Sequence, residues 1–568
     1  MNAASSSPSS FLKIRTWKVW DNPIFRRYCR SRLRPRGLGI SLLITVLIAG
    51  FIVALANSAA VRNPSHALDA MRGALIPMLI IQAVILFVFG TAQVAGGMTA
   101  ERDEGVIDYQ RLIPMSPLAK VLGYLFGLPV REYVMFLATL PFAAWLFWKG
   151  HVKAAAWMQL YAALFTSTLL YHFTGLLTGT VAKNRRWAFL ASIGLVFCLY
   201  TVIPQLSKFG LVFFKYLTIT PVVEEMLPEI LPPDAAAGWK ALQRFDPTVK
   251  FFNLDFSELV FTVFSQLALI LTFTIMLCRK WRRAESHLLG KLWATGFFVW
   301  IQVLLLGNAI PLIDPGDLFI SRAMNRFTRF HSWEPQPMEA VVMSGVYGIF
   351  TLLLLFVLAG IITPSPENQV KGWRRARKQG DSSLPVRSDA ATSFWFVILM
   401  AFAGAAGWFL FTRELVESRW YPGHFVDLKV FAYYAAVLLT GGLGFQLLLE
   451  AWGGRVLILV TIFVGVVPLM LGAVLSTMSD RLYPASAWLV GVSPISTPLY
   501  ASGALLSLTQ LPVSIAKAIP LAFFFWLFVG VVINLWLIGR LFTARRAMAK
   551  EVLTGGEVPG ETSSAEGM

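Results

Sequence analysis

The sequence predicts an all-α protein that crosses a membrane many times. Hydrophobic residues make up 56% of its 568 residues and charged residues only 14%, whereas about a quarter of an ordinary soluble domain is charged. The mean hydropathy is +0.64. The apolar residues form continuous runs of about twenty, the length with which a helix crosses a hydrocarbon core of roughly 30 Å. A membrane β-barrel would instead alternate polar and apolar residues in segments of about ten.

About twelve such runs are candidate membrane spans. Backbone polar groups in lipid must be satisfied within their own segment, so we expect each run to be a helix. An even number of crossings would place both termini on the same side of the membrane. The runs lie near residues 38–57, 75–97, 121–148, 155–182, 187–206, 257–278, 288–311, 340–363, 393–411, 430–450, 456–478 and 519–539.

Lysine and arginine residues indicate which side of the membrane each loop faces. Loops rich in these residues stay in the cytoplasm, so we expect a multi-pass protein of the plasma (inner) membrane with both termini cytoplasmic. The net charge of +18 then reflects topology and contact with anionic lipids, and we expect no nucleic-acid partner. The N-terminal arm holds nine basic residues: Lys13, Arg15, Lys18, Arg26, Arg27, Arg30, Arg32, Arg34 and Arg36.

Four segments follow from this pattern. Residues 1–37 form a basic segment in which apolar residues alternate with charges, which is typical of an amphipathic helix in the lipid headgroup region. Residues 38–283 and 284–546 form two six-helix halves, each ending in an apolar span followed by a basic stop. An ancient duplication would explain this likeness, although helix bundles of this length also match by chance. Residues 547–568 form a cytoplasmic tail that lacks the hydrophobicity to order itself.

The most specific motif is a polar stretch between two apolar runs, 101–116. Glu101 and Arg102 open it, Gly105 follows three residues after Arg102, and Asp108 lies three residues further on. The stretch ends with Pro114-Met115-Ser116. Read as a helix, it places Val106, Tyr109, Leu112 and Ile113 on one face and Glu104, Asp108 and Arg111 on the other, as expected for an amphipathic helix at a membrane surface.

This spacing resembles the cytoplasmic coupling segment of type-2 ATP-binding-cassette permeases, the membrane subunits of exporters driven by a separate ATPase. The alternative interpretation is a charged loop between two spans, which would explain the charges but not the full spacing. The resemblance implies that Glu101, Arg102, Asp108 and Arg111 contact or orient towards the ATPase. It also implies that Gly105 permits close approach and that Pro114 ends the helix.

The resemblance further implies a transport subunit with no cofactor and no catalytic activity of its own. An ATPase subunit, as two copies or a heterodimer, would bind ATP and magnesium. The chain lacks the Gly-x-x-x-x-Gly-Lys-Ser/Thr phosphate-binding loop, which agrees with nucleotide binding on a partner. The corresponding loop of the second half, 364–392, lacks the motif and is a basic patch that faces lipid or a partner. The identity of the exported substrate does not follow from the sequence.

Three polar residues within apolar runs are candidate intramembrane sites: Arg131, Glu132 and His172. Leu128-Pro129 could end a short cytoplasmic helix and leave Arg131 and Glu132 near the interface; a buried structural role and a role in transport are the alternatives. Neighbouring helix residues point about 100° apart, so we do not expect these two to pair directly. A single histidine within a span is more often a hydrogen-bonded helix contact than a proton carrier.

Two other classes of function are compatible with a polytopic membrane protein. An ion-coupled secondary transporter would suit the repeated halves, but few acidic residues lie deep in the spans. A membrane-embedded lipid transferase would need a cluster of acids or histidines on one face, which the sequence does not show. The three cysteines and six histidines have no metal-ligand spacing, so we expect no metal site.

Overall fold

The computed structural model describes residues 18–181, 185–232, 248–325, 333–506 and 513–554. The first part of the predicted N-terminal helix and the end of the predicted tail lie outside these residues. The chain divides into two compact units. Unit 1 comprises Met1–Gln205, Phe214–Val249 and Asp255–Ala284, and unit 2 comprises Leu206–Phe213, Lys250–Leu254 and Glu285–Met568. Two short segments of unit 2 therefore come from within the sequence of unit 1.

The all-α class is confirmed, and the described residues contain 11 helices that are long and apolar enough to cross a membrane. The predicted spans 430–450 and 456–478 fall together in one element, Leu428–Met478. That element is not straight, because Gly453 has φ 75° and ψ 179° in its middle. Val437 and Gly465 line the same 300 Å³ cavity, although a straight helix would separate them by roughly 40 Å. The chain therefore turns back on itself at Gly453.

The helices of unit 1 follow one another through short connections. A π-helical stretch, Val84–Gly90, lies within the candidate span Pro64–Asp103. Further along are 3-10 turns at Ile203–Phe209 and Val212–Leu217, of which residues 206–213 belong to unit 2. A two-stranded hairpin, β1 (Thr248–Phe251) and β2 (Leu254–Ser257), precedes the last helix. The helices are α1 (Pro23–Arg32), α2 (Pro35–Arg62), α3 (Ala67–Gly73), α4 (Leu75–Ala83), α5 (Thr91–Asp103), α6 (Val106–Leu112), α7 (Pro117–Gly127), α8 (Val130–Lys149), α9 (Ala154–Val181), α10 (Arg185–Phe197), α11 (Thr220–Ile230) and α13 (Glu258–Arg282).

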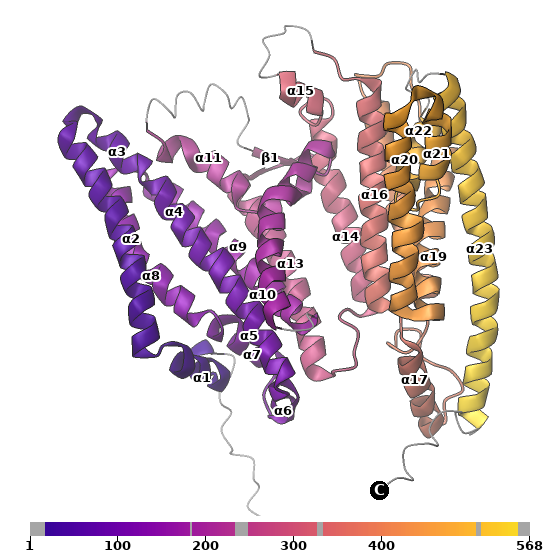
Figure 1. Cartoon of the computed structure of the whole chain (residues 1–568), viewed down its shortest axis with the longest axis horizontal. Helices are drawn as coiled ribbons and strands as arrows, with labels where there is room; N and C mark the ends of the chain where they lie inside the picture. Colours follow the sequence, from indigo (N-terminus) through magenta and orange to yellow (C-terminus); the bar gives the residue numbers. More distant parts are fainter. Residues whose placement is uncertain (1–17, 182–184, 233–247, 326–332, 507–512, 555–568) are drawn as a thin grey trace, which may run out of the picture. The chain divides into compact units, whose positions relative to one another are not determined.

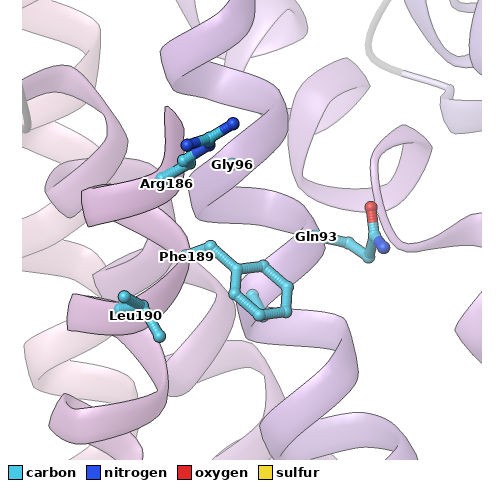
Figure 2. Close-up of a pocket in the computed structure, with 6 residues that line it drawn as sticks. Gln93, Gly96, Arg186, Phe189 and Leu190 are labelled. Carbon is cyan, nitrogen blue, oxygen red and sulfur yellow. The ribbon is translucent and has the colours of Figure 1, made fainter. Parts of the chain in front are cut away.

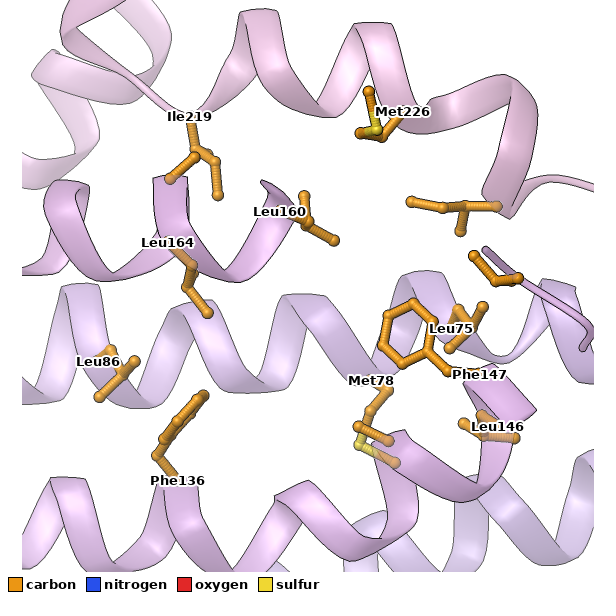
Figure 3. Packing of buried hydrophobic residues seen from close by; sticks show 14 of the residues in the cluster. Leu75, Met78, Leu86, Phe136, Leu146, Phe147, Leu160, Leu164, Ile219 and Met226 are labelled. Carbon is orange, nitrogen blue, oxygen red and sulfur yellow. The ribbon is translucent and has the colours of Figure 1, made fainter. Parts of the chain in front are cut away.

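Two apolar clusters stabilise unit 1. Figure 3 shows the larger one, in which side chains of α4, α8 and α9 meet those of α11. The smaller one joins α1, α5, α6, α7, α9 and α13. Figure 1 places α1, α6 and α7 at one end of unit 1 and α3 and α11 at the other. Helix α11 (Thr220–Ile230) contributes the buried side chains of Val222 and Ile230 to this unit.

The predicted span 121–148 is divided by a break. Helix α7 ends at Gly127 and α8 begins at Val130, with Pro129 immediately before its first residue. Proline has no N–H to donate and fits the start of a helix better than its interior. The candidate span is accordingly Val130–Lys149. Arg131 and Glu132 therefore lie in its first turn and not in its middle.

The helices of unit 2 are longer and carry a polar centre. Ser344 accepts a hydrogen bond from Trp408 Nε1 (3.0 Å) and contacts the hydroxyls of Thr412 (2.7 Å) and Ser502 (3.0 Å), and all four side chains are buried. Helix α23 continues through Thr554, into the segment predicted to be a disordered tail. The helices are α14 (Lys291–Ala309), α15 (Ile320–Asn325), α16 (Pro337–Ile362), α17 (Pro366–Gln379), α18 (Phe394–Val416), α19 (Leu428–Val460), α20 (Val467–Met478), α21 (Tyr483–Val490), α22 (Thr497–Leu505) and α23 (Val513–Thr554).

Candidate partner-binding helix and its supports

The stretch 101–116 folds into the end of one helix, a separate short helix and the start of a third. Helix α5 ends at Asp103, and Gly105 has φ 71°, a left-handed conformation that favours glycine. A Cβ added at Gly105 would meet nothing within 4 Å, so within this chain the backbone angle is what requires glycine. Helix α6 ends before Pro114, and Ser116 caps α7 by accepting a hydrogen bond from the N–H of Ala119 (3.2 Å).

Glu101 is the centre of a cluster of hydrogen bonds within unit 1. Its carboxylate pairs with the guanidinium of Arg27 and accepts hydrogen bonds from the hydroxyls of Tyr28 (2.7 Å) and Tyr124 (3.2 Å). The Glu101 side chain is only 12% exposed. These contacts connect α1, α5 and α7. Glu101 therefore has three partners inside the chain.

The electrostatics of this cluster favour neutral tyrosines beside a charged glutamate. Burial, with the adjacent Glu101 carboxylate, raises the pKa of Tyr28 well above its ordinary value. Burial also raises the pKa of Tyr124, with Tyr28 and Glu101 adding to the effect. Both hydroxyls consequently keep their protons and remain hydrogen-bond donors at any physiological pH.

Arg102 connects the end of α5 to the end of α9. Its Nη1 donates to the carbonyl of Thr180 (3.2 Å), and its Nη2 pairs with the neighbouring Asp103 (2.8 Å). The two helices approach closely here, because a Cβ added at Gly179 would lie 2.7 Å from Cβ of Met98. Arg102 thus satisfies a carbonyl at the C-terminus of α9, where a positive charge is favourable.

Helix α6 is fixed to the body of unit 1 through one of its faces. Ile107 and Gln110, three residues apart, are buried, and Ile107 belongs to the smaller apolar cluster. Arg111 pairs with Asp108, and its Nη2 lies 3.5 Å from the carbonyl of Lys280 at the end of α13. The tip formed by α6 is therefore joined to the end of a long helix, α13, that begins 146 residues after α6 ends.

The opposite face of α6 is open and combines apolar and acidic side chains. Tyr109 is 70% exposed and Leu112 is 82% exposed. The Asp108 side chain is 79% exposed, and in helical angle Leu112 lies between Asp108 and Tyr109. Pro114 and Glu104 are exposed as well. We refer to Asp108, Tyr109 and Leu112 as the α6 outer face; it presents two large apolar anchors beside a negative charge.

Helix α1 rests in a groove that two glycines of α7 make possible. Asn22 is fully buried; its Oδ1 caps α1 by accepting from the N–H of Ile24 (3.0 Å), and its Nδ2 donates to the carbonyl of Ala119 (2.6 Å). A Cβ added at Gly123 would lie 2.7 Å from Asn22 Oδ1, and one at Gly127 would lie 2.8 Å from Tyr28. Larger residues at these positions would push α1 away from α7.

Arg131 and Glu132 pair directly, so the expectation that they do not is wrong. Arg131 Nη2 lies 2.8 Å from a carboxylate oxygen of Glu132. The backbone directions do diverge, but the long arginine stem bends back to reach its neighbour. Glu132 is 2% exposed and Arg131 34% exposed. This arrangement neutralises a buried carboxylate near the end of the span.

His172 is a helix contact with both ring nitrogens occupied. Nδ1 lies 2.8 Å from the hydroxyl of Tyr133, and Nε2 lies 3.0 Å from the carbonyl of Leu86. A carbonyl can only accept, so Nε2 carries the proton. Leu86 lies in the π-helical stretch, and the ring packs on Gly90, where an added Cβ would lie 2.5 Å from Nε2. The histidine therefore joins three helical elements and fits the hydrogen-bonding interpretation.

The second-half loop contains a basic helix, α17, with different surroundings. Ser365 caps it and Gly380, with φ 77°, ends it. Lys371 and Arg375 pair with Glu285 (3.0 and 3.4 Å), and Arg377 lies 3.5 Å from the carbonyl of Val552 on α23. Its three arginines are Arg374, Arg375 and Arg377. Helix α17 is thus a positively charged surface, in contrast to the acidic and apolar outer face of α6.

A groove of 520 Å³ runs between α5 and α10. Figure 2 shows Arg186, Phe189 and Leu190 along α10, facing the part of α5 that carries Gln93 and Gly96. Apart from Gln93 and Arg186 the lining is apolar, a composition that suits an apolar or amphipathic molecule. The described residues contain no group of three or more histidine, cysteine or acidic side chains placed to hold a metal ion.

Sequence reasoning missed most of the supports of this site. Arg27, Tyr28 and Tyr124 hold Glu101, yet none of them stood out in the sequence as a partner. The Asn22-Pro23 and Ser116-Pro117 pairs are a recognisable signal, a capping residue followed by proline at the first helical position. Comparison of the chain with family models, with curated proteins and with solved structures found no match.

Proposed function

We propose that this chain is the membrane-spanning permease subunit of an ATP-driven exporter and that α6 couples it to a separate ATPase. The observation that carries the proposal is the α6 outer face: Tyr109 and Leu112 are largely exposed at the tip of unit 1. Exposed aromatic and aliphatic anchors with a charge beside them are typical of the centre of a protein interface. ATP and magnesium would bind to the ATPase, as two copies or a heterodimer.

The supports of α6 give this face a mechanical role. Its inner face packs into the cluster that joins α5, α7, α9 and α13, and Arg111 reaches the end of α13. A movement imposed on the outer face would thus be passed to several long helices at once, because packed cores move as bodies rather than deform. Glu101 and Arg102 act in this proposal as positioning residues that hold the base of α6.

The finer topology belongs to the same proposal. If the two arms that meet at Gly453 each cross the membrane, the chain has twelve crossings in two six-helix halves. Both termini, α6 and α17 then face the cytoplasm of a plasma (inner) membrane, and α1 lies along its surface. The basic residues of α1 and α17 support this orientation. The substrate would be exported.

The experiment that tests the proposal compares variants of the outer face with variants of a matched exposed surface. The tagged full-length chain is purified from its native membranes with its associated ATPase. Replacing Tyr109 and Leu112 by alanine, or reversing both charges of the Asp108–Arg111 pair, should weaken the association roughly 10- to 100-fold. Replacing the exposed Trp20 by alanine is the control and should leave it unchanged.

Two results would contradict the proposal. Recovery of the ATPase at wild-type level with the outer-face variants would mean that α6 is not the docking site. Transport driven by an ion gradient in reconstituted membranes that contain no ATPase would favour a secondary transporter instead.

A further inference from the structure

The junction between α1 and α2 contains an open hollow with a strongly basic lining. Its volume is 580 Å³, and four arginines line it: Arg32, Arg34, Arg36 and Arg131. Arg32 is the last residue of α1 and Arg34 is the capping residue just before α2, while Arg36 and Arg131 lie in the first turns of α2 and α8. We call this hollow the arginine elbow. Only one carboxylate, that of Glu132, pairs with any of the four among the described residues.

Two of the four arginines are bound by neighbouring side chains that the structure describes, and the other two are not. Arg32 donates to Gln93 Oε1 (2.9 Å), and Arg131 is held by Glu132. The side chains of Arg34 and Arg36 are exposed and make no ion pair or hydrogen bond with any described residue. Two guanidinium groups are therefore available for an external anion, beside two that are already fixed in place.

The chain continues from this hollow directly into an apolar surface. Helix α2 begins at Pro35 and is the least buried of the candidate spans among the described residues, with 11% of an apolar 18-residue stretch buried. Ile40, Leu43, Ile44 and Leu47, spaced along one side of the helix, are each more than half exposed. A positive hollow at the end of an apolar stripe matches a molecule with an anionic head and hydrocarbon tails.

We propose that the arginine elbow binds the headgroup of an anionic phospholipid, whose acyl chains lie along α2. Guanidinium groups bind phosphate oxygens through paired hydrogen bonds and are the preferred side chains for this purpose. The elbow lies where a surface helix turns into a span, which is the depth of the headgroups. A free phosphate ion would use the arginines but would gain nothing from the exposed side of α2.

The bound lipid would also affect the candidate coupling site, a consequence that rests on the proposed function. Helix α1 leads into the elbow, and its Arg27 and Tyr28 hold Glu101 at the base of α6. A lipid that fixes the elbow would hold α1 against α7. The binding of lipid is measured without an ATPase, so its outcome is independent of whether α6 couples to one.

The test is native mass spectrometry of the full chain in neutral detergent. Phosphatidylglycerol and phosphatidylcholine with identical acyl chains are titrated separately. We expect phosphatidylglycerol to bind at least tenfold more tightly to the wild-type chain. The double variant Arg34→Gln, Arg36→Gln should weaken phosphatidylglycerol binding roughly 10- to 30-fold and leave phosphatidylcholine binding unchanged. The control double variant Arg30→Gln, Arg62→Gln loses the same amount of charge outside the elbow. It should leave the binding of both lipids unchanged.

Further measurements separate loss of the site from loss of folding. The melting temperature without added lipid should be the same for both double variants, and Arg34→Lys, Arg36→Lys should recover most of the phosphatidylglycerol affinity. Undiminished phosphatidylglycerol binding by the glutamine variant would overturn the proposal, as would an equal loss of both lipids. Displacement of the lipid by millimolar inorganic phosphate would overturn it in favour of a free-phosphate site.

Discussion

Replacing Glu101 should loosen α1 and the base of α6, whereas replacing Asp108 should leave both in place. The sequence groups these two acids in one motif, but the structure gives them different surroundings. The Glu101 side chain is 12% exposed and has three partners, Arg27, Tyr28 and Tyr124. The Asp108 side chain is 79% exposed and pairs with Arg111 within α6.

The size of the effect follows from these contacts. A hydrogen bond to a charged group contributes about 1.5–3 kcal/mol, and loss of the acceptor also leaves buried donors unsatisfied. The contribution of Arg27 is discounted because it is 44% exposed and therefore screened by solvent. Glu101→Ala should then reduce the free energy that holds α1 in place by about 2–4 kcal/mol. An exposed pair such as Asp108–Arg111 contributes about 0–1 kcal/mol.

The native Cys29 on α1 provides the assay. It is half-buried, and burial raises the pKa of its thiol, so it should react slowly with a thiol reagent while α1 is docked. With Cys198 and Cys278 replaced by serine, Glu101→Ala should raise the labelling rate of Cys29 at least tenfold, since each 1.4 kcal/mol changes the open population about tenfold. Asp108→Asn is the matched control. Equal labelling rates in the two variants would refute this account of Glu101.

Three other predictions concern the membrane topology, Glu225 on helix α11, and helix α17 of the second half. In a cysteine-free background, a membrane-impermeant reagent applied to intact cells should label Asn253→Cys and not Ser382→Cys; labelling of Ser382→Cys would invert the proposed orientation. Burial and the nearby Glu258 raise the pKa of the Glu225 carboxyl above 4.5. The protonated side chain therefore stabilises the fold fully below about pH 4.5, and this stabilisation is lost as the pH rises through the raised pKa. The melting temperature of the protein should fall as the pH rises above 4.5, and it should fall less in the Glu225→Gln variant. Neutralising the three α17 arginines should leave much of the ATPase stimulation in reconstituted membranes, whereas disrupting the α6 outer face should abolish it, and equal losses would show that both helices couple.

The local features of the fold were predictable because they depend on neighbouring residues. The apolar runs predicted the long helices, and Leu128-Pro129 indicated the break between α7 and α8. Tertiary partners were not predictable in this way. Arg27 lies 74 residues before Glu101 in the sequence, and nothing in the intervening residues indicates that they meet.

Two of the predictions made from the sequence differ from the structure, and each difference has a physical explanation. Arg131 and Glu132 pair because side-chain flexibility overcomes the divergence of their backbone directions. The tail beyond 547 is partly helical because α23 continues past the apolar residues to Thr554, and there Arg377 of α17 lies 3.5 Å from the carbonyl of Val552. In both cases a long arginine side chain makes the contact. The composition and periodicity of a sequence do not reveal how far such a side chain reaches.

The most direct test of the central proposal is site-specific photocrosslinking from the α6 outer face in living cells. A photoreactive phenylalanine analogue placed at Leu112 should form a covalent adduct with an ATP-binding-cassette ATPase, identified by mass spectrometry. The same analogue at the exposed Trp20 should not form that adduct. Crosslinking of Leu112 to lipid alone, or to proteins that do not bind ATP, would contradict the proposal that α6 couples this chain to an ATPase.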